Sequence, residues 1–159
     1  MPRIITFLVA VIFSITLSAQ NNLEEKAIKQ VISTFFDGLH KGDSSVLKST
    51  FHKGIIIQTT FTNKKGEKKL RAQTKENLLK GVANKKASDT YFEKLLSYTI
   101  KIDGNLASVW TPYEFYLNGK FSHCGANSFQ LFNNNGKWQI IYLVDMRRRK
   151  DCKASNQKK

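Results

Sequence analysis

Apolar residues recur with helical spacing near the start of the chain. Over residues 23–39 they fall at every third or fourth position, so one wide apolar stripe would run along a helix. Asp43 follows this segment as a short acidic side chain that caps backbone amides, which predicts a second, short helix over 44–50. Thr74 stands in the same position before a third helical segment that reaches about residue 86. The pattern therefore predicts three helices in the first part of the chain.

Strand-like patterns occupy most of the remaining sequence. Residues 55–61 are rich in β-branched side chains, and the glycine-containing turn at 63–67 predicts a short return strand over 68–72. From residue 91 onward the polarity alternates with a period of two, and turns divide this region into an antiparallel meander with strands at 98–102, 106–117, 121–132 and 138–146. Because helices precede a long sheet, we predict an α+β fold with helices packed on one face of a strongly curved, mostly antiparallel sheet.

The turn at Asn118-Gly119 sets the expected register in the middle of this sheet. A two-residue type I′ turn there pairs Leu117 with Lys120. Continued without interruption, the same register pairs Glu114 with His123, and their side chains then share one face.

The last hairpin defines the face that we expect to line a cavity. Aligning Trp138 with Leu131 places Asn127 opposite Tyr142. This face then carries Phe129, Leu131, Trp138, Ile140, Tyr142 and Val144. A bulge at Pro112, a residue that is awkward in a central strand, would bring Ala107, Val109, Ile100 and Ile102 onto the same face. Since bulges curve a sheet and helices close it, we expect a cavity here.

The first nineteen residues have the layout of a secretory signal. Arg3 precedes an apolar run at 4–17, and the small residue Ala19 stands where a signal peptidase would cut. The run of about 14 residues is shorter than the roughly 20 that a membrane-spanning helix needs. We therefore expect residues 1–19 to be removed and the mature chain to be periplasmic or secreted, without stable membrane insertion; an uncleaved anchor is the alternative.

The two cysteines acquire a specific meaning in an exported protein. Cys124 lies in a predicted strand, and Cys152 lies in the basic C-terminal tail at 148–159. A disulfide between them would close a loop of about 28 residues and contribute roughly 3 to 4 kcal/mol. The alternative is two separate thiols, with Cys124 packed as a small hydrophobic residue.

Several short segments resemble a known superfamily. Residues 35–43, which read Phe-Phe-Asp-Gly-Leu-His-Lys-Gly-Asp, are similar to the end of the first helix in the nuclear transport factor 2-like (SnoaL-like) superfamily. Residues 109–116 and 121–125, Val-Trp-Thr-Pro-Tyr-Glu-Phe-Tyr and Phe-Ser-His-Cys-Gly, look like its branch of small exported bacterial proteins labelled as lumazine-binding. The resemblance extends over about 25–147 and implies a cone-shaped fold for a domain at 20–147. It implies no single function, because the superfamily contains isomerases, dehydratases, cyclases, epoxide hydrolases and binding modules.

Polar side chains on the expected cavity face are the first candidates for chemistry. Glu114 beside His123 would form an acid/base pair, while Asn127 and Tyr142 would donate hydrogen bonds to a substrate oxygen. The alternative is that Glu114 and His123 form an exposed pair at the open end of the sheet, which contributes less than about 1 kcal/mol.

The opposite parity of the same strands offers a second set of candidates. It places Cys124 opposite Asp145 and Ser122 opposite Arg147, with Tyr113 nearby. If this face lines the pocket, Asp145 and Arg147 would bind a polar or anionic ligand, the arginine through two parallel hydrogen bonds. An outward ion pair and a dimer interface are the alternatives for this set.

The net charge does not alter the expected fold or the candidate site residues. The chain has 26 Lys and Arg against 12 Asp and Glu, a formal net charge of +14. After removal of the signal, the excess lies in residues 64–86, with nine basic and two acidic side chains, and in residues 147–159, with seven and one. Aromatic residues are not interleaved with either basic run, so we expect no nucleic-acid partner. His40, His52 and His123 lack metal-ligand spacing, and we predict neither a metal nor a cofactor.

The sequence thus predicts an exported domain that binds a small hydrophobic or mixed-polarity ligand and forms a homodimer through its exposed sheet face. An alternative is a cofactor-independent isomerase, dehydratase or hydrolase that uses acid/base groups of the pocket. A protein-interaction module is the second alternative. An enclosed pocket in which Glu114 and His123, or Asp145 and Arg147, converge would favour catalysis. An apolar pocket would favour binding, and a filled cone would favour interaction alone.

Overall fold

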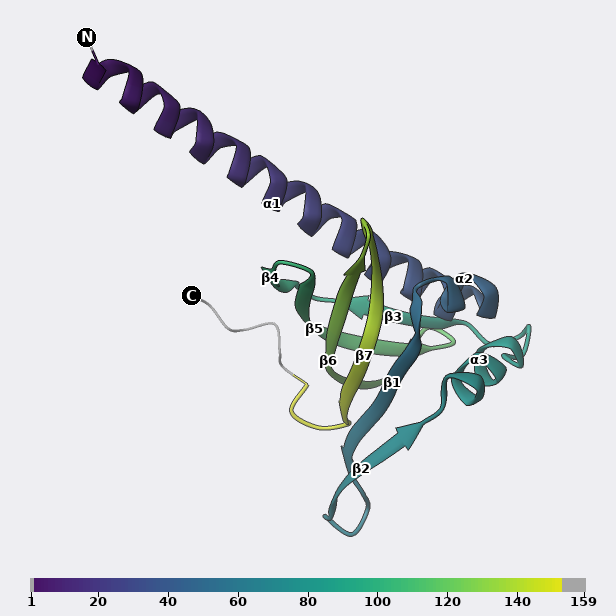
Figure 1. Cartoon of the computed structure of the whole chain (residues 1–159). Coiled ribbons are helices and arrows are strands. Elements are labelled where there is room, and N and C mark those ends of the chain that lie inside the picture. Colours follow the sequence, from purple (N-terminus) through teal and green to yellow (C-terminus); the bar gives the residue numbers. More distant parts are fainter. Residues whose placement is uncertain (1, 153–159) are drawn as a thin grey trace.

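The computed structural model describes the backbone of residues 2–152 and the side chains of residues 22–152. Within this part, the chain forms three helices and seven strands (Figure 1). In chain order the elements are α1 (Pro2–Lys41), α2 (Ser44–Ser49), β1 (Phe51–Thr62), β2 (Lys68–Gln73), α3 (Lys75–Ala83), β3 (Tyr91–Leu95), β4 (Thr99–Asp103), β5 (Leu106–Leu117), β6 (Lys120–Asn134) and β7 (Lys137–Arg148).

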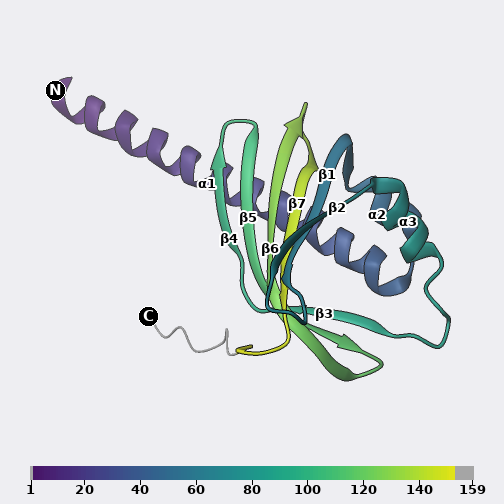
Figure 2. The same cartoon turned by 90° about the horizontal axis from the view of Figure 1, so that it is seen from below.

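All seven strands belong to one curved sheet with the order β2-β1-β7-β6-β5-β3, and β4 also pairs with β5. Only the β1–β7 pairing is parallel among the described strands. Figure 2 shows the C-terminal part of α1 beside one face of the sheet, while its N-terminal part extends beyond the strands. The predicted α+β architecture with a strongly curved, mostly antiparallel sheet is confirmed.

The face of the sheet that α1 covers, here called the inner face, holds the hydrophobic core. Ile28, Ile32 and Phe35 of α1 are buried in one cluster with Val109 of β5 and Phe129 of β6. The rings of Phe35 and Phe129 meet edge to face with centroids 5.5 Å apart. The apolar stripe that predicted the helix over 23–39 is therefore the surface that closes the cone.

The predicted helix caps are confirmed. One carboxylate oxygen of Asp43 accepts hydrogen bonds from the backbone amides of Ser45 and Val46, each at 2.9 Å. The hydroxyl of Thr74 accepts from the amide of Asn77 at 3.1 Å. These side chains satisfy amides that have no partner within their own helix, which is why α2 and α3 begin where they do.

Helix α1 begins at Pro2, so it includes the predicted helix over 23–39 and nearly all of the segment predicted as a signal, residues 1–19. No described helix has the length and apolar character required to cross a bilayer. Removal of the signal stays a prediction. The predicted basic tail at 148–159 is described only as far as residue 152, and residues 153–159 lie outside the described part of the chain.

Strand β3 was absent from the predicted meander, although its residues alternate in polarity. It pairs with the C-terminal half of β5, where Leu95 faces Tyr113 and Tyr91 faces Leu117. Strand β4 pairs with the N-terminal half of the same strand. Two short strands therefore share one long neighbour, and β3 brings a further row of side chains to the inner face.

The register of the β5–β6 hairpin differs from the predicted one beyond its turn. The pair next to Asn118-Gly119 forms as expected, but β6 contains one extra residue close to the turn. His123 consequently faces Phe115, and Glu114 faces Cys124. The predicted Glu114–His123 pair is therefore wrong, because a single inserted residue moves every later side chain to the opposite face.

The predicted bulge at Pro112 is also wrong. Pro112 pairs regularly with Ala126, and its neighbour Thr111 pairs with Asn127. Ala107 and Val109 nevertheless lie in the core, as predicted, because the irregularity near the turn produces the same change of parity.

A second irregularity shifts the β6–β7 hairpin. Leu131 pairs with Ile140 rather than with Trp138, and β7 then contains one extra residue before Tyr142. As a result, Asn127 faces Asp145 instead of Tyr142. Tyr142 and Val144 thus leave the predicted cavity face for the outer face of the sheet, while Trp138, Ile140, Phe129 and Leu131 remain in the core.

Candidate functional site

A row of four buried polar residues crosses the inner face of the sheet. Thr59 of β1 pairs with Asp145 of β7, Asp145 pairs with Asn127 of β6, and Asn127 pairs with Thr111 of β5. All four are buried. With Glu93, Tyr113 and Arg147 they form what we call the carboxylate cluster. The strand register places these side chains together from positions that are far apart in the sequence.

Asp145 is the negative centre of the carboxylate cluster. The hydroxyl of Thr59 donates to Asp145 Oδ1 at 2.6 Å. Arg147 donates from Nε to Oδ2 and from Nη2 to Oδ1, so the guanidinium engages both carboxylate oxygens. The Tyr113 hydroxyl donates to Oδ2 at 3.4 Å. Charge-assisted contacts of this kind fix both the carboxylate and the guanidinium. The Arg147 side chain remains 46% exposed, whereas that of Asp145 is 11% exposed.

Glu93 brings a second carboxyl group to the cluster. Asn127 donates from Nδ2 to Glu93 Oε1 at 2.7 Å and to the Thr111 hydroxyl at 3.5 Å. Burial raises the pKa of Glu93 to about 7, and the nearby negative charge of Asp145 acts in the same direction. The hydrogen bond from Asn127 and the positive charge of Arg147 oppose this rise in the pKa. Burial thus dominates the environment of the Glu93 carboxyl group, whereas the Asp145 carboxylate is paired directly with a guanidinium.

His40 holds β3, and with it Glu93, against the end of α1. Its Nε2 accepts a hydrogen bond from the backbone amide of Glu93 at 2.8 Å. Burial lowers the pKa of His40, while the charge of Asp37 counteracts this. A neutral imidazole is the form that can accept this bond. The residue thus has a structural role in positioning the carboxylate cluster.

Aromatic rings flank the cluster on the inner face. His123 stacks on Phe115 with ring centroids 4.9 Å apart and meets Tyr113 edge-on at 5.8 Å. Burial and the positive charge of Arg147 lower the pKa of His123 to about 4, although Asp145 acts in the opposite direction. His123 is therefore neutral near pH 7, and its ring adds a flat surface rather than a charge.

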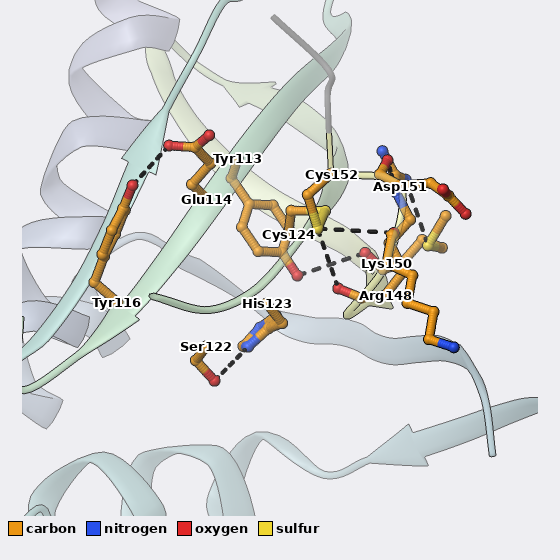
Figure 3. Close-up of a disulfide and its surroundings, with 11 residues drawn as sticks. Tyr113, Glu114, Tyr116, Ser122, His123, Cys124, Arg148, Lys150, Asp151 and Cys152 are labelled. Carbon is orange, nitrogen blue, oxygen red and sulfur yellow. Dashed lines mark hydrogen bonds between the residues drawn. A yellow bond between two sulfur atoms is a disulfide. The ribbon is translucent and has the colours of Figure 1, made fainter. Parts of the chain in front are cut away.

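The residues predicted from the sequence separate into two groups. Tyr113, Asn127, Asp145 and Arg147 meet in the carboxylate cluster, and His123 lies beside it. Glu114 and Tyr142 do not: Glu114 accepts a hydrogen bond from the Tyr116 hydroxyl at 2.9 Å, as Figure 3 shows, and Tyr142 donates to Gln58 at 2.5 Å. The predicted acid/base pair of Glu114 with His123 is thus not formed.

Three members of the carboxylate cluster were missed: Thr59, Thr111 and Glu93. A signal for Glu93 exists in the sequence, because Tyr91 and Leu95 lie two residues to either side of it. An acidic residue between two apolar residues of the same parity indicates a carboxyl group on a buried face. The signal is usable only once residues 91–95 are recognised as a strand.

Cys124 and Cys152 form a disulfide, with their Cα atoms 5.6 Å apart (Figure 3). The alternative of two separate thiols does not describe this structure. The residues before Cys152 turn back on β7, where Arg148 Nε donates to the carbonyl of Asp151 at 3.2 Å. The predicted opposition of Cys124 and Asp145 is wrong, since Cys124 faces Arg148. The disulfide thus joins the start of the tail to β6.

The described surface includes two grooves that bear on the site. The larger has a volume of about 580 Å³ and lies where β1, β2 and β7 run side by side, with Arg147 in its lining. The smaller, of about 330 Å³, lies between α1 and the β6–β7 turn and includes Val31 and Trp138. The carboxylate cluster therefore borders the larger groove through Arg147. No group of His, Cys, Asp and Glu suited to a metal ion occurs among the described residues.

The curved sheet and the helix that covers it have the nuclear transport factor 2-like fold. More specifically, the chain belongs to the family described as "Putative lumazine-binding", whose sequence profile matches residues 23–144. The predicted superfamily and branch are confirmed.

Solved structures with the same fold share little sequence with this chain. A nuclear transport factor 2-like protein of unknown function from Shewanella baltica is 20% identical, with a TM-score of 0.59, over 79% of this chain and 94% of that one. One from Cytophaga hutchinsonii is 14% identical, with a TM-score of 0.61, over 78% and 98%. A protein of unknown function from Mycobacterium tuberculosis is 11% identical, with a TM-score of 0.66, over 82% and 75%. No curated protein matches the chain.

Proposed function

We propose that this protein is an exported domain that binds a small ligand of mixed polarity at the carboxylate cluster. The observation that carries this proposal is the buried row Thr59–Asp145–Asn127–Thr111, to which Arg147 and Glu93 are joined by hydrogen bonds. Well-packed apolar side chains would serve stability as well as or better than a buried ionic network. A recognition role accounts for retaining polar groups at this place.

The surroundings of the cluster favour a flat ligand with a polar edge. Phe115 and His123 present stacked rings, and the partly exposed Arg147 offers donors toward solvent. Lumazine, a fused heteroaromatic ring with several hydrogen-bonding atoms, has this chemistry and gives the family its description. It is therefore a suitable probe. The proposal of export rests on the signal-like residues 1–19.

Native mass spectrometry of the protein purified from its own host tests the proposal directly, because a bound small molecule would add a discrete mass. In a parallel fluorescence titration with lumazine, Glu93→Gln should weaken binding by about tenfold, since it alters a carboxyl group of the cluster. Glu114→Gln is the matched control on the outer face and should bind normally. The proposal is rejected if native mass spectrometry finds no added mass and lumazine does not bind. It is also rejected if Glu93→Gln and Glu114→Gln bind lumazine equally well.

A second candidate function, a cofactor-independent isomerase, is favoured by the contrast between Asp145 and Glu93. Arg147 and Thr59 hold the Asp145 carboxylate, whereas Glu93 has a pKa of about 7 and exchanges its proton readily near neutral pH. Burial and Asp145 raise the pKa of Tyr113, which stays a hydrogen-bond donor. Glu93 would remove a proton beside a substrate carbonyl and return it at another carbon.

The isomerisation of cyclohex-3-enone to cyclohex-2-enone, followed by absorbance of the conjugated product, tests this candidate. Wild-type protein should accelerate the reaction with a pH inflection near 7, and Glu93→Gln should reduce the rate by about 100-fold or more. Glu114→Gln should retain the rate. If Glu93→Gln matches wild type, the catalytic candidate fails while the binding proposal stands on its own titration.

A further inference from the structure

The larger groove, which we call the β1–β2–β7 groove, is distinct from the interior of the cone. Its lining residues are Thr60, Phe61, Thr62, Lys68, Lys69, Leu70, Met146, Arg147 and Arg148. Leu70, Thr60 and Met146 pair in one row across the three strands. This row has the opposite parity to Thr59 and Asp145, so it lies on the outer face of the sheet.

The floor of this groove is apolar and open to solvent. Leu70 is 62% exposed and Met146 is 37% exposed. Phe61 also lines the groove, but it has the parity of Thr59, and its ring lies 5.7 Å from the guanidinium of Arg71. A volume of about 580 Å³ falls within the range of small-molecule sites. Burying these side chains under an apolar group is therefore favourable.

The rim of the groove carries positive charge that the described residues do not fully balance. Lys69 pairs with Glu67 at 2.9 Å, and Arg147 pairs with Asp145. Lys68 and Arg148 make no ion pair with a described residue; the contacts of Arg148 are with the carbonyl of Asp151 and the sulfur of Met146. An apolar floor beside two uncompensated cations suits a molecule with an apolar body and an anionic end.

We propose that the β1–β2–β7 groove binds an anionic amphiphile, such as a long-chain carboxylate, with its apolar body on Leu70 and Met146 and its charge at Lys68 and Arg148. The disulfide positions Arg148 for this contact. Cys124 faces Arg148 across the strands, and Cys152 holds the turn whose Asp151 carbonyl accepts from Arg148 (Figure 3). A free small amphiphile is favoured over a membrane surface because the apolar side chains and the cations line one groove of about 580 Å³.

Binding is tested with 8-anilinonaphthalene-1-sulfonate, a fluorescent probe that has an apolar body and one sulfonate. We expect saturable binding, displaced by dodecanoate below its micelle concentration and much more weakly by uncharged dodecan-1-ol. Arg148→Gln should lower the affinity for dodecanoate by about tenfold. Lys101→Gln on β4 makes the same charge change away from the groove and should leave the affinity unaltered.

Two further variants separate the parts of the proposal. Leu70→Ser should weaken both dodecanoate and dodecan-1-ol, and it removes an exposed side chain, so folding is retained. Cys152→Ser should weaken dodecanoate alone, because it releases the turn at Arg148 while the apolar floor remains. Far-UV circular dichroism of every variant checks that a lost affinity is not a lost fold.

Three outcomes overturn the proposal. Equal displacement by dodecanoate and dodecan-1-ol would show that the anionic end is not recognised. Arg148-dependent sedimentation with vesicles of phosphatidylglycerol and phosphatidylcholine, without binding of free dodecanoate, would assign the groove to a membrane surface. A lower oligomer mass for Leu70→Ser, with unchanged dodecanoate affinity, would assign it to a contact between copies of the chain. Glu93→Gln should leave dodecanoate affinity intact, so this result is independent of the proposed cluster function.

Discussion

Glu93 shows how one residue can link the chemistry of the carboxylate cluster to its stability. Its carboxyl group is buried beside Asp145, and its pKa is raised to about 7 from an ordinary value of 4.5. The folded state therefore holds this proton over a pH range in which the unfolded chain has lost it. Stability from this group is present below pH 4.5 and decreases as the pH rises toward 7.

We expect wild-type protein to lose up to about 3 kcal/mol relative to Glu93→Gln between pH 4.5 and 7, because glutamine does not titrate. Urea unfolding of both proteins at several pH values, followed by tryptophan fluorescence, measures this difference. His123 has a lowered pKa of about 4 and favours the opposite slope between pH 6.5 and 4. Comparing the two proteins at each pH removes that contribution. A difference independent of pH would contradict the assignment.

At the scale of elements, bulges determine which side chains reach the interior. Helical periodicity, the caps Asp43 and Thr74 and the Asn118-Gly119 turn identified most elements, because each depends on neighbouring residues. The carboxylate cluster was identified only in part, since it depends on register over long strands. One extra residue near the β5–β6 turn and one in β7 change the face of Glu114 and Tyr142. Such insertions have no local sequence signal as clear as a cap or a turn.

Gly125 reveals how closely the strands approach beside the carboxylate cluster. It pairs with Tyr113 on one side and with Arg147 on the other, and a Cβ atom there would overlap the carbonyl oxygen of Met146. Gly125→Ala should therefore destabilise the fold by about 1 to 3 kcal/mol. Gly81→Ala is the control: nothing lies within 4 Å of its added Cβ, and a helix interior favours alanine. Thermal unfolding should give shifts of opposite sign, and a neutral Gly125→Ala would contradict the close approach.

At the scale of the whole molecule, charge and apolar surface are divided between different regions. The basic residues concentrate in 64–86 and 147–159, while the remainder of the mature sequence has nine basic and nine acidic side chains. The excess positive charge therefore lies in the segment from the β1–β2 turn to just beyond α3, of which Lys68 and Lys69 line the β1–β2–β7 groove, and at the C-terminal end of the sequence. The outer face of the sheet has a different character: Ile56 is 54% exposed and Trp110 is 50% exposed on strands that lie on either side of β6 and β7.

A homodimer through the part of this outer face that carries Ile56 and Trp110, outside the β1–β2–β7 groove, is the assembly that we propose. The helices cover the inner face (Figure 2), and these two large apolar side chains of the outer face remain in solvent. Sedimentation equilibrium of wild-type protein should give twice the monomer mass. Trp110→Asp should give the monomer mass, since it places a charge among side chains buried between copies. Leu23→Asp changes an exposed apolar residue of α1 and should leave the dimer intact. A monomeric wild type would overturn the proposed dimer, and a dimer that survives Trp110→Asp would place its interface on another surface.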